Sequence, residues 1–409
     1  MGGTAQIEGT PAGELATAAP ETARTGGRPL ACVLGGPDLI RPLGIAGIRC
    51  ATVGRPDSPK AYSRFVDVLI DWADNWNDHD RMRTNLLAFA AGQPAPPVLF
   101  FQHDGDVLFV SRYRDVLAGS FRFAIGDADL IEASVDKRRF HILAREHGLP
   151  TPRTAILHPA GAPVPDLELQ YPLILKPLTR RDDAWRPHAG RAKALRVESP
   201  DALASLWPRL AESALELIAQ ELVEGGEERI ESYHAYVDAG GEVVGEFTGR
   251  KIRTVPPAFG ETTACEITDE ADVRELGRRC MATLGLRGVA KLDFKRSPAG
   301  TLELLEINPR FNLWHYPGAV AGVNLPALVY ADLAGLPRPA AGPVRAGVRW
   351  TVPWHDWTAA RMQGVPALRW LAFQARCETR HIVALDDPMP FLRGFVWRHA
   401  KRRLRRARR

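Results

Sequence analysis

Polar and apolar positions alternate along residues 288–296 and 301–308, on either side of a short segment that contains Pro298 and Gly300. Proline fixes φ and glycine accepts a positive φ, so this segment is predicted to be a tight turn between two antiparallel strands. Residues two apart on a strand share a face, so the pairing gathers one set on a polar face: Lys291, Asp293, Lys295, Leu304, Glu306 and Asn308. The opposite face is apolar and predicts a core: Leu292, Phe294, Leu305 and Ile307.

The register of this hairpin follows from its loop. A loop of two or four residues sets Asp293 opposite Leu304 and Arg296 opposite Thr301, whereas a bulge between Asp293 and Glu306 would separate the two carboxylates. Carboxylate and amide oxygens with no His or Cys nearby are ligands for hard cations such as Mg²⁺ or Mn²⁺, which usually also bind water and nucleotide phosphates. The hairpin therefore indicates nucleotide chemistry. The alternative is a solvated sheet face, which would more often carry Thr, Ser and charges of both signs.

The segment before residue 126 predicts an α/β domain over residues 29–125. It contains short apolar runs that read as strands: residues 30–36, 47–54, 97–101 and 106–110. A short helix at 37–46 lies between the first two runs, which is the pattern of a βαβ unit in a parallel sheet. The glycine turn at 35–38 does not match GxGxxG and is weak evidence for dinucleotide binding.

The middle of the chain alternates between helix and strand signals. Helices are predicted at 127–148, with a second helix beginning at 134–137 inside this span, and at 199–219, 270–284 and 324–333. Strands are predicted at 154–157, 171–177, 231–237 and 242–253. Lys176 closes an apolar strand, either as an edge charge that reaches water or as a phosphate ligand on a rigid element. Residues 178–192 are rich in Arg, Asp, His, Pro and Gly, and predict a mobile flap over an anionic ligand.

Length and composition limit the class of protein. A chain of 409 residues with 45% hydrophobic and 25% charged residues is expected to form two or three soluble globular domains. Residues 1–28 lack the features of a signal peptide and predict a disordered leader. No apolar run approaches the roughly 20 residues of a membrane span. Five widely spaced cysteines without a CxxC pair fit reduced thiols, so we expect a cytoplasmic protein.

The charge of the chain is unevenly distributed. The formal net charge is +5, but residues 398–409 contain eight Lys and Arg residues and no acid, so the rest of the chain carries −3. This basic tail follows an aromatic segment at 391–397. It could lie on an anionic membrane, bind nucleic acid by charge, or continue a helix that its aromatics pack against the protein while the basic end stays solvated.

Several motifs occur in one order along the chain: Lys137, Lys176, QELVEGGEE at 220–228, RKIRTVPPAFG at 250–260, LLEINPRF at 304–311 and DDPMP at 386–390. Over roughly residues 30–395 the chain resembles the ATP-grasp superfamily, and within it the carboxylate-amine ligases that are similar to carbamoyl-phosphate synthase and D-aspartate ligase. The ordered set is specific although each motif alone is common.

The resemblance implies an α/β fold class, α+β in the ATP-grasp part. A Rossmann-like pre-ATP-grasp domain at 29–125 would precede a two-subdomain ATP-grasp domain at 126–340, whose lid subdomain covers about 150–220. A C-terminal extension at 341–397 and the basic tail at 398–409 would follow.

The resemblance also implies ATP with Mg²⁺ or Mn²⁺ as cofactors, and it assigns the ATP-binding positions: Lys137 and Lys176 on the phosphates, Glu221, Leu222 and Val223 along the adenine, Glu228 on the ribose, and Lys251 on phosphate or substrate. Glu224 or Glu227 could replace Glu228, because the glycine turn leaves the register open. The metal ligands would be Asp293, Glu306 and Asn308, where many relatives have Glu in place of Asp293. Arg310 would be the catalytic arginine that steadies the phosphoryl group or the acyl phosphate.

Weaker candidates surround this set. Arg250 is a candidate phosphate or substrate contact, or else a solvated strand end. Trp185, His188 and Lys193 lie in or beside the flap. His315 and Tyr316 follow the metal strand and either face substrate or pack the loop.

The implied reaction has two steps, in which ATP phosphorylates a carboxylate and an amine then displaces phosphate. The expected partners are a small-molecule carboxylate and an amine, with a homodimer by analogy to related ligases. The alternatives are a non-catalytic ATP-binding regulatory module and an ATP-grasp enzyme that uses a thiol or another nucleophile. No zinc site, Ser-His-Asp order or Walker lysine motif can be assembled from the sequence.

Overall fold

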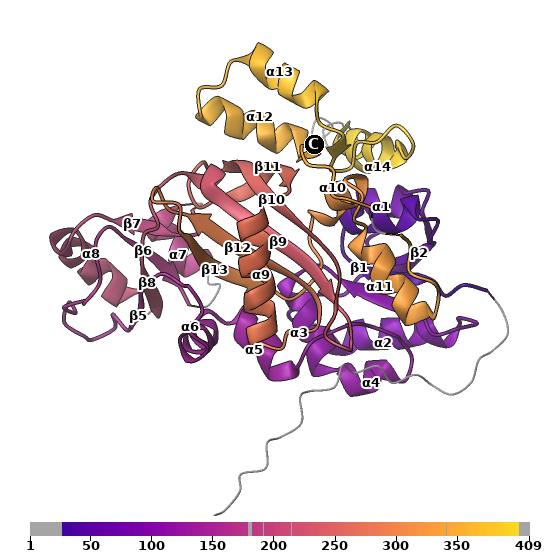
Figure 1. Cartoon of the computed structure of the whole chain (residues 1–409), viewed down its shortest axis with the longest axis horizontal. Helices are drawn as coiled ribbons and strands as arrows, with labels where there is room; N and C mark the ends of the chain where they lie inside the picture. Colours follow the sequence, from indigo (N-terminus) through magenta and orange to yellow (C-terminus); the bar gives the residue numbers. More distant parts are fainter. Residues whose placement is uncertain (1–26, 179–181, 191, 214, 341, 401–409) are drawn as a thin grey trace, which may run out of the picture.

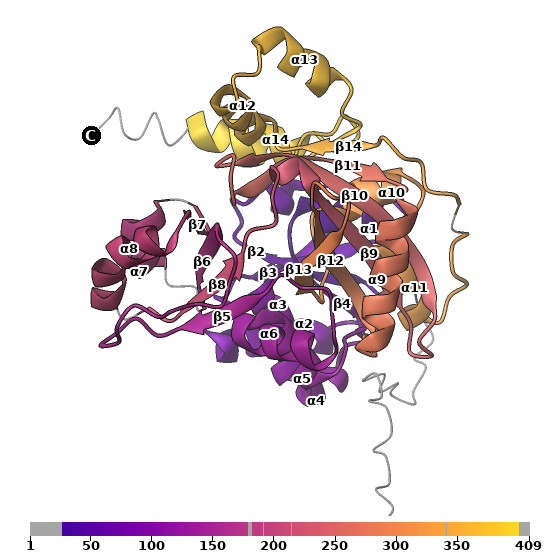
Figure 2. The ribbon, with the colours of Figure 1, turned by 60° about the vertical axis from the view of Figure 1, so that its left-hand side comes forward.

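Three β-sheets organise the computed structural model of the chain, which describes residues 27–178, 182–190, 192–213, 215–340 and 342–400. Figure 1 shows a small subdomain at the left, a large twisted sheet in the centre and the N-terminal sheet with its helices at the right and below. Turned by 60°, the molecule shows the small subdomain projecting from the body (Figure 2). Every helix in the described ranges is too short or too polar to span a bilayer.

The N-terminal sheet is parallel, with the order β3-β2-β1-β4. Its strands are β1 (Ala31–Leu34), β2 (Cys50–Gly54), β3 (Val66–Asp71) and β4 (Val98–Phe101). The helices are α1 (Pro37–Ile45), η1 (Pro59–Tyr62), α2 (His79–Ala91), α3 (Asp104–Arg112) and α4 (Arg114–Ala118). β1, β2 and β4 are buried along their whole length, as expected for parallel strands covered on both faces.

The strand predicted at 106–110 is wrong, because this apolar run belongs to α3. Asp106 accepts hydrogen bonds from the backbone NH and the ring of His103, which caps the start of the helix. The apolar residues of a short buried run fit a helix and a strand equally well, and here the capping contact shows that the run begins a helix.

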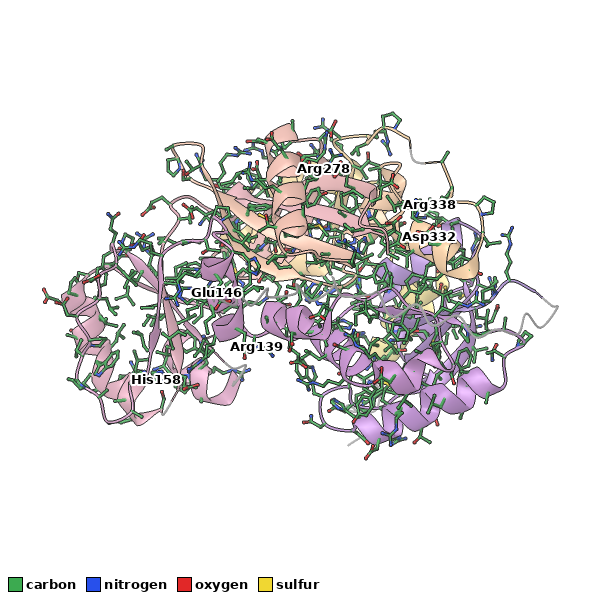
Figure 3. The ribbon with its side chains drawn as sticks, turned by 60° about the horizontal axis from the view of Figure 1, so that its bottom comes forward. Arg139, Glu146, His158, Arg278, Asp332 and Arg338 are labelled. Atoms are coloured by element: carbon green, nitrogen blue, oxygen red, sulfur yellow. The ribbon has the colours of Figure 1, made fainter. Side chains whose placement is uncertain are left out.

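The small subdomain contains an antiparallel sheet in the order β5-β8-β6-β7. Two helices lead into it, α5 (Ala128–Val135) and α6 (Lys137–Glu146). Its own elements are β5 (Thr154–Leu157), β6 (Leu173–Pro177), α7 (Asp182–Ala189), β7 (Leu195–Val197), α8 (Pro200–Glu212) and β8 (Leu217–Glu221). Figure 3 shows this arrangement, with Arg139 and Glu146 on α6 and His158 at the edge of the small subdomain.

One helix prediction in this region needs correction, and another is confirmed. The helix predicted at 199–219 ends at Glu212, and residues 217–221 form the strand β8, which pairs with both β5 and β6. The second helix predicted to begin at 134–137 is confirmed, because Asp136 is extended and its side chain caps the start of α6. The flap predicted at 178–192 contains α7, while residues 179–181 and 191 lie outside the described residues.

The large sheet has seven strands in the order β13-β12-β9-β10-β11-β14-β15. They are β9 (Ile230–Val237), β10 (Val243–Val255), β11 (Glu261–Thr268), β12 (Gly288–Arg296), β13 (Leu302–Asn308), β14 (Arg349–Thr351) and β15 (Thr379–Arg380). The associated helices are η2 (Glu227–Arg229), α9 (Ala271–Thr283), α10 (His315–Val320) and α11 (Leu325–Ala334). α9 packs its apolar side on one face of the sheet (Figure 1), and α10 and α11 lie between the other face and the N-terminal domain.

The register of the β12–β13 hairpin differs from the prediction. Asp293 pairs with Glu306, not with Leu304, and Arg296 pairs with Leu302 rather than Thr301. The register shifts after Asp293, so that Phe294 pairs with Leu304 and one extra residue bulges on β13. A bulge moves the following side chains to the other face, so Leu304 is fully buried in the core beneath α9. The bulge brings the two carboxylates opposite one another instead of separating them.

The chain beyond residue 352 adds helices above the large sheet: α12 (Pro353–Met362), α13 (Ala367–Ala375), α14 (Met389–Phe391) and the π-helix η3 (Leu392–Trp397). Arg253 of β10 holds α12 through two hydrogen bonds of 2.7 Å to the buried carboxylate of Asp356. Asp387 accepts from the Ser63 hydroxyl at 2.6 Å and from the Arg64 backbone NH at 3.0 Å, which ties the DDPMP segment to the N-terminal domain. The leader at 1–28 and the tail at 398–409 lie mostly outside the described residues.

Candidate active site

Two lysines from different elements meet at the end of β6. Lys137 is the first residue of α6, which the Asp136 side chain caps. The Nζ of Lys137 donates to the carbonyl oxygen of Pro177, the last residue of β6, at 2.8 Å. Lys176 precedes Pro177, and its Nζ donates to Oε1 of Gln220 at 3.3 Å. The structure therefore brings the two predicted phosphate lysines together.

The ionisation of Lys176 shows which charges surround it. Burial disfavours the ammonium and lowers the pKa of Lys176, an effect to which the positive charges of Lys137 and Lys251 add. The carboxylates of Glu306 and Glu227 oppose it. These groups come from α6, β6, β10, η2 and β13, so five separate elements build one charged site. Its three ammonium groups provide a setting that favours an anion.

The predicted adenine hinge, Glu221 to Val223, begins at the last residue of β8, where the chain leaves the small subdomain for the large sheet. The Leu222 backbone NH donates to the carbonyl oxygen of Pro172 at 3.0 Å. The Glu221 carboxylate accepts from the Gln170 backbone NH at 2.8 Å, so this side chain is already engaged. Recognition of a base at this hinge would therefore use backbone groups.

The glycine turn leaves three glutamates in different surroundings. Glu227 Oε2 lies 3.8 Å from the Nζ of Lys251, and Glu227 Oε1 accepts from the Phe259 backbone NH at 3.3 Å. Glu224 and Glu228 are exposed. The alternative acid, Glu227, therefore lies beside Lys251, whereas Glu228 lies at the solvent-exposed edge of the site.

The proposed metal ligands lie on the adjacent strands β12 and β13. Asp293 is 2% exposed, and its carboxylate accepts a hydrogen bond from the Ser232 hydroxyl and lies 2.5 Å from the Nζ of Lys291. Glu306 stands opposite Asp293 and is exposed, and its Oε1 accepts from the Asn308 side-chain amide at 3.1 Å. The three predicted oxygen donors therefore face the same side of the sheet.

The charge state of Asp293 suits a cation site. Burial by itself would raise the pKa of Asp293, but the ammonium groups of Lys291 and Lys251 hold it below its usual value. Asp293 is thus a carboxylate at neutral pH. No cluster of three or more His, Cys, Asp or Glu side chains in the described residues is arranged for a metal. Two carboxylates and one amide oxygen are nevertheless a donor set that fits Mg²⁺, which usually takes only one or two protein carboxylates.

Arg310 connects the metal strand to the N-terminal domain. Its Nη2 donates to Oδ1 of Asn308 at 3.0 Å, and its Nε donates to Oδ1 of Asp104, at the start of α3, at 2.6 Å. Its Nη1 donates to the carbonyl oxygen of Gln102 at 2.9 Å. The guanidinium therefore lies at the junction of the two domains, beside the proposed metal ligands.

The N-terminal domain contributes a glycine turn to this junction. The Gly36 backbone NH donates to Oε1 of Gln102 at 2.6 Å, and the Nζ of Lys60 donates to the Gly35 carbonyl oxygen at 2.7 Å. Burial lowers the pKa of Lys60 to about 8, while the charge of Asp106 opposes the shift. Lys60, Gln102 and Asp104 were not predicted from the sequence. The available signal was that β1, β2 and β4 are parallel, so that the loops at their carboxyl ends meet at one edge.

Three weaker candidates lie outside this set. Arg250 precedes Lys251 on β10 and points to the opposite face, where it pairs with Glu266 at 2.7 Å. Lys193 is an exposed residue 3.8 Å from Glu261. Trp185 is buried in the core of the small subdomain. These contacts within the protein explain the positions of the three side chains, so no contact with a ligand is needed to explain them.

The histidine and tyrosine after the metal strand are packed. His315 is fully buried 5.3 Å from the Phe311 ring, and burial lowers its pKa to about 3. The Arg41 guanidinium lies 4.9 Å from the centre of the Tyr316 ring. His188 contacts the Trp185 ring within the small subdomain. The structure therefore favours loop packing over substrate contact for His315 and Tyr316.

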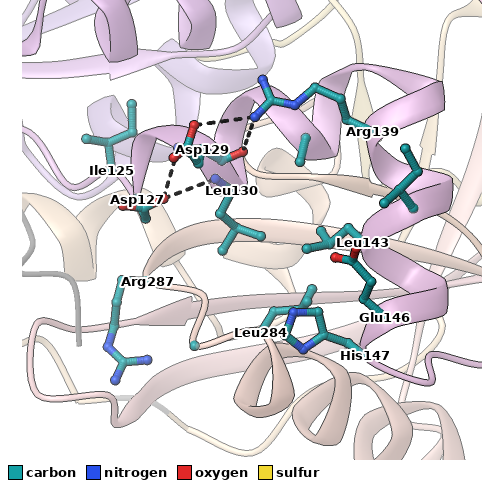
Figure 4. Close-up of a pocket in the computed structure, with 14 residues that line it drawn as sticks. Ile125, Asp127, Asp129, Leu130, Arg139, Leu143, Glu146, His147, Leu284 and Arg287 are labelled. Atoms are coloured by element: carbon teal, nitrogen blue, oxygen red, sulfur yellow. Dashed lines mark hydrogen bonds and ion pairs between the residues drawn. The ribbon is translucent and has the colours of Figure 1, made fainter. Parts of the chain in front are cut away.

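A separate cavity of about 630 Å³ lies between α5, α6 and the turn before β12 (Figure 4). Its floor includes Leu130, Leu143 and Leu284, and Asp127 and Arg287 stand on its rim. None of the predicted site residues lines it. The charged site around Lys176 and Asp293 is therefore distinct from this cavity.

The chain thus combines a three-part architecture with a charged site between its parts. The predicted α/β fold class and the predicted resemblance to the ATP-grasp superfamily are confirmed by comparison with known proteins. Residues 242–353 match the model of a family described as "ATP-grasp in the biosynthetic pathway with Ter operon".

Two curated relatives are D-alanine–D-alanine ligases. The protein from Ectopseudomonas mendocina is 25% identical over 221 residues, which are 49% of this chain and 65% of the relative. The protein from Halorhodospira halophila is 28% identical over 187 residues, which are 42% of this chain and 56% of the relative. The chain thus matches less than two thirds of the length of either relative.

Solved structures show the same fold. An ADP complex of N5-carboxyaminoimidazole ribonucleotide synthetase superposes with a TM-score of 0.59 at 15% identity, covering 83% of this chain and 85% of that one. The L-amino acid ligase from Bacillus licheniformis gives a TM-score of 0.55 at 16% identity, and the match covers 75% of this chain and 74% of that one. The names of these proteins agree with the predicted ligase class.

Proposed function

We propose that the chain is an ATP-dependent ligase that activates a carboxylate as an acyl phosphate and joins it to an amine, with release of ADP and phosphate. The observation that carries this proposal is the convergence of Lys137, Lys176 and Lys251 with the carboxylates of Glu306 and Asp293. Ammonium groups that favour phosphate and oxygen donors that favour a hard cation are what a bound metal–nucleotide complex requires.

The residues of the site take distinct roles in this proposal. Lys137 and Lys176 bind phosphate oxygens, with Lys251 beside them. The hinge at 221–223 receives the adenine through its backbone, and the ribose hydroxyls donate to Glu228 at the rim or to Glu227 further in. These roles follow from position and charge together.

Asp293, Glu306 and Asn308 would hold Mg²⁺, or Mn²⁺, which supplies charge neutralisation at the phosphates when bound. Arg310 would steady the transferred phosphoryl group, a role that its position beside Asn308 and its contact with the N-terminal domain support. Asp104 accepts from the Arg310 Nε and so fixes the direction of the guanidinium. A fixed, planar donor group costs little reorganisation as charge develops.

The chemistry needs no covalent nucleophile from the protein. A carboxylate oxygen of the first substrate attacks the γ-phosphorus, and the bond between phosphorus and the ADP oxygen breaks. The amine nitrogen then attacks the acyl carbon, the bond to the phosphate oxygen breaks, and the nitrogen loses a proton. Catalysis consists of positioning and charge neutralisation. The substrates are proposed to be small molecules, and the homodimer remains a prediction.

The test is ADP release from the full chain with ATP, Mg²⁺ and pairs of amino acids, with mass spectrometry of the products. We expect a product of condensed mass to appear together with ADP. The Glu306→Ala variant should lose turnover and keep its fold, whereas Glu275→Ala, an exposed glutamate on α9, should behave as wild type. Tight ATP binding without turnover for any pair would favour the regulatory module. A product formed only with thiols would favour the other nucleophile, and near-normal turnover by Glu306→Ala would refute the metal assignment.

A further inference from the structure

The helical segment α14–η3, residues 389–397, is fixed in one orientation on the body of the protein. A Cβ atom on Gly394 would lie 2.4 Å from the Cα of Pro59, so only glycine permits this close approach to η1. The Phe395 ring stacks on Trp354 of α12 with their centres 4.5 Å apart. Because one side of the segment is packed in this way, its other side faces solvent.

The solvent side of this segment is apolar. Four large apolar side chains are exposed: Met389 at 41%, Leu392 at 48%, Val396 at 46% and Trp397 at 59%. A surface helix normally turns its polar residues outward and its apolar residues to the core. In this segment the packed side and the solvent side are both apolar, and Arg393 is an exposed charged residue among the apolar side chains of the solvent side. We call these four side chains and Arg393 the outer C-terminal surface.

A strongly basic sequence follows this surface. Residues 398–409 contain eight Lys and Arg residues and no Asp or Glu, although the rest of the chain is mildly acidic. Nearby carboxylates are already paired, since Asp57 lies 3.2 Å from the Nε of Arg398 and Asp386 lies 2.7 Å from the guanidinium of Arg41. Arg398 therefore shares its charge with Asp57, and the basic sequence contributes seven further Lys and Arg residues. Residues 401–409 lie outside the described residues and enter only by their sequence.

We propose that the outer C-terminal surface and the basic sequence after it dock on an anionic lipid bilayer. Apolar side chains on a helix that lies along a membrane enter the boundary between headgroups and acyl chains, and adjacent Lys and Arg side chains neutralise anionic headgroups. Stable attachment generally needs two such signals, and this segment supplies both within 21 residues, 389–409. The proposal goes beyond the ligase function and does not depend on it.

Other occupants fit the surface less well. A nucleic acid would bind the cationic residues through its phosphates, and the apolar side chains of the outer C-terminal surface would make no contact with it. A second copy of the chain would bring two sets of eight cationic residues together, which like-charge repulsion opposes. An anionic bilayer uses both the apolar and the cationic parts of the segment.

The test is flotation of the full chain with vesicles of phosphatidylcholine alone or mixed with phosphatidylglycerol, at low and high salt. We expect binding to the mixed vesicles only, with at least a tenfold loss at high salt. The double variant Leu392→Ser with Val396→Ser should reduce binding about tenfold, because it removes buried methylene groups. Val116→Ser is the matched control, since Val116 is 50% exposed on α4, at the other end of the molecule from α14 (Figure 1).

A second set of variants tests the charge. Replacing Arg405, Arg406, Arg408 and Arg409 by Gln should abolish the preference for anionic vesicles. Thermal unfolding of every variant checks that the fold is kept, since the altered side chains are exposed or lie beyond η3.

Three results would overturn the proposal: equal binding to both kinds of vesicle, unchanged vesicle binding by the serine variant, or salt-sensitive binding to RNA without vesicle binding. Sedimentation that shows a dimer dissociated by the two serines would instead assign the surface to a second copy of the chain.

Discussion

The ion pair between Lys291 and Asp293 offers a direct test of how the proposed metal strand is stabilised. Both side chains are almost fully buried, at 8% and 2% exposure, with the Nζ 2.5 Å from the carboxylate. Lys291→Met keeps the apolar stem and removes the charge, so that Asp293 keeps the Ser232 hydroxyl but loses its nearest cation. Removing one partner of a buried pair typically costs about 3–5 kcal/mol. We expect a loss of that order in the free energy of unfolding.

A second variant distinguishes the loss of the ion pair from a loss of side-chain packing. Asp293→Asn in the Lys291→Met background removes the unpaired charge and should restore most of the lost stability. Lys295→Met is a matched control on the same strand and face, where burial lowers the pKa of the lysine. Removing an ammonium group that burial destabilises should cost less than removing Lys291. Urea unfolding followed by tryptophan fluorescence measures all four proteins without metal or nucleotide.

The pH dependence has a definite sign. The folded pKa of Asp293 is lowered, so its contribution is present above the unfolded value of about 3.9 and is lost as the pH falls through the folded value. In Lys291→Met burial should dominate and raise that pKa above the unfolded value, so the deficit of the variant should shrink as the solution is acidified. A deficit below about 1 kcal/mol, or no rescue by Asp293→Asn, would show that the pair does not stabilise the strand.

Further predictions concern the phosphate site, the domain junction and the C-terminal helices. Lys176→Ala should raise the KM for ATP and lower kcat in the ADP-release assay, with an unchanged melting temperature. Arg310→Lys should lower kcat about 10²-fold, because one ammonium cannot replace three directed NH groups, and an unchanged kcat would contradict its role. Arg253→Ala should destabilise the protein by about 3–5 kcal/mol in urea unfolding, since it leaves Asp356 buried and unpaired. Wild type should gain stability relative to Lys60→Met between about pH 8 and 10, because the unfolded lysine binds more protons there.

The fold class and the site residues that lie within continuous motifs could be predicted from the sequence. Asp293, Glu306 and Asn308 could be placed on one face because strand periodicity is local, and Lys176 could be placed at a strand end for the same reason. The ordered motifs then indicated the superfamily. These inferences needed no knowledge of how distant segments meet.

The remaining features depend on non-local contacts. The β13 bulge that brings Glu306 opposite Asp293 leaves no pattern in the sequence, since Leu304 and Leu305 are both leucine. The choice between Glu227 and Glu228 depends on where Lys251 lies, more than 20 residues away. The contact of Arg310 with Asp104 joins residues 206 positions apart. Hydrophobic periodicity carries no information about such pairs.

The central claim is that the site transfers the γ-phosphoryl group of ATP to a carboxylate. The most direct measurement supplies an amino-acid substrate pair with ¹⁸O in the carboxylate and analyses the released phosphate by mass spectrometry. The acyl phosphate route predicts one ¹⁸O atom in each phosphate that accompanies product, because the bridging oxygen leaves with phosphorus. Released phosphate without ¹⁸O, in the presence of ADP, would show transfer to water and contradict the claim.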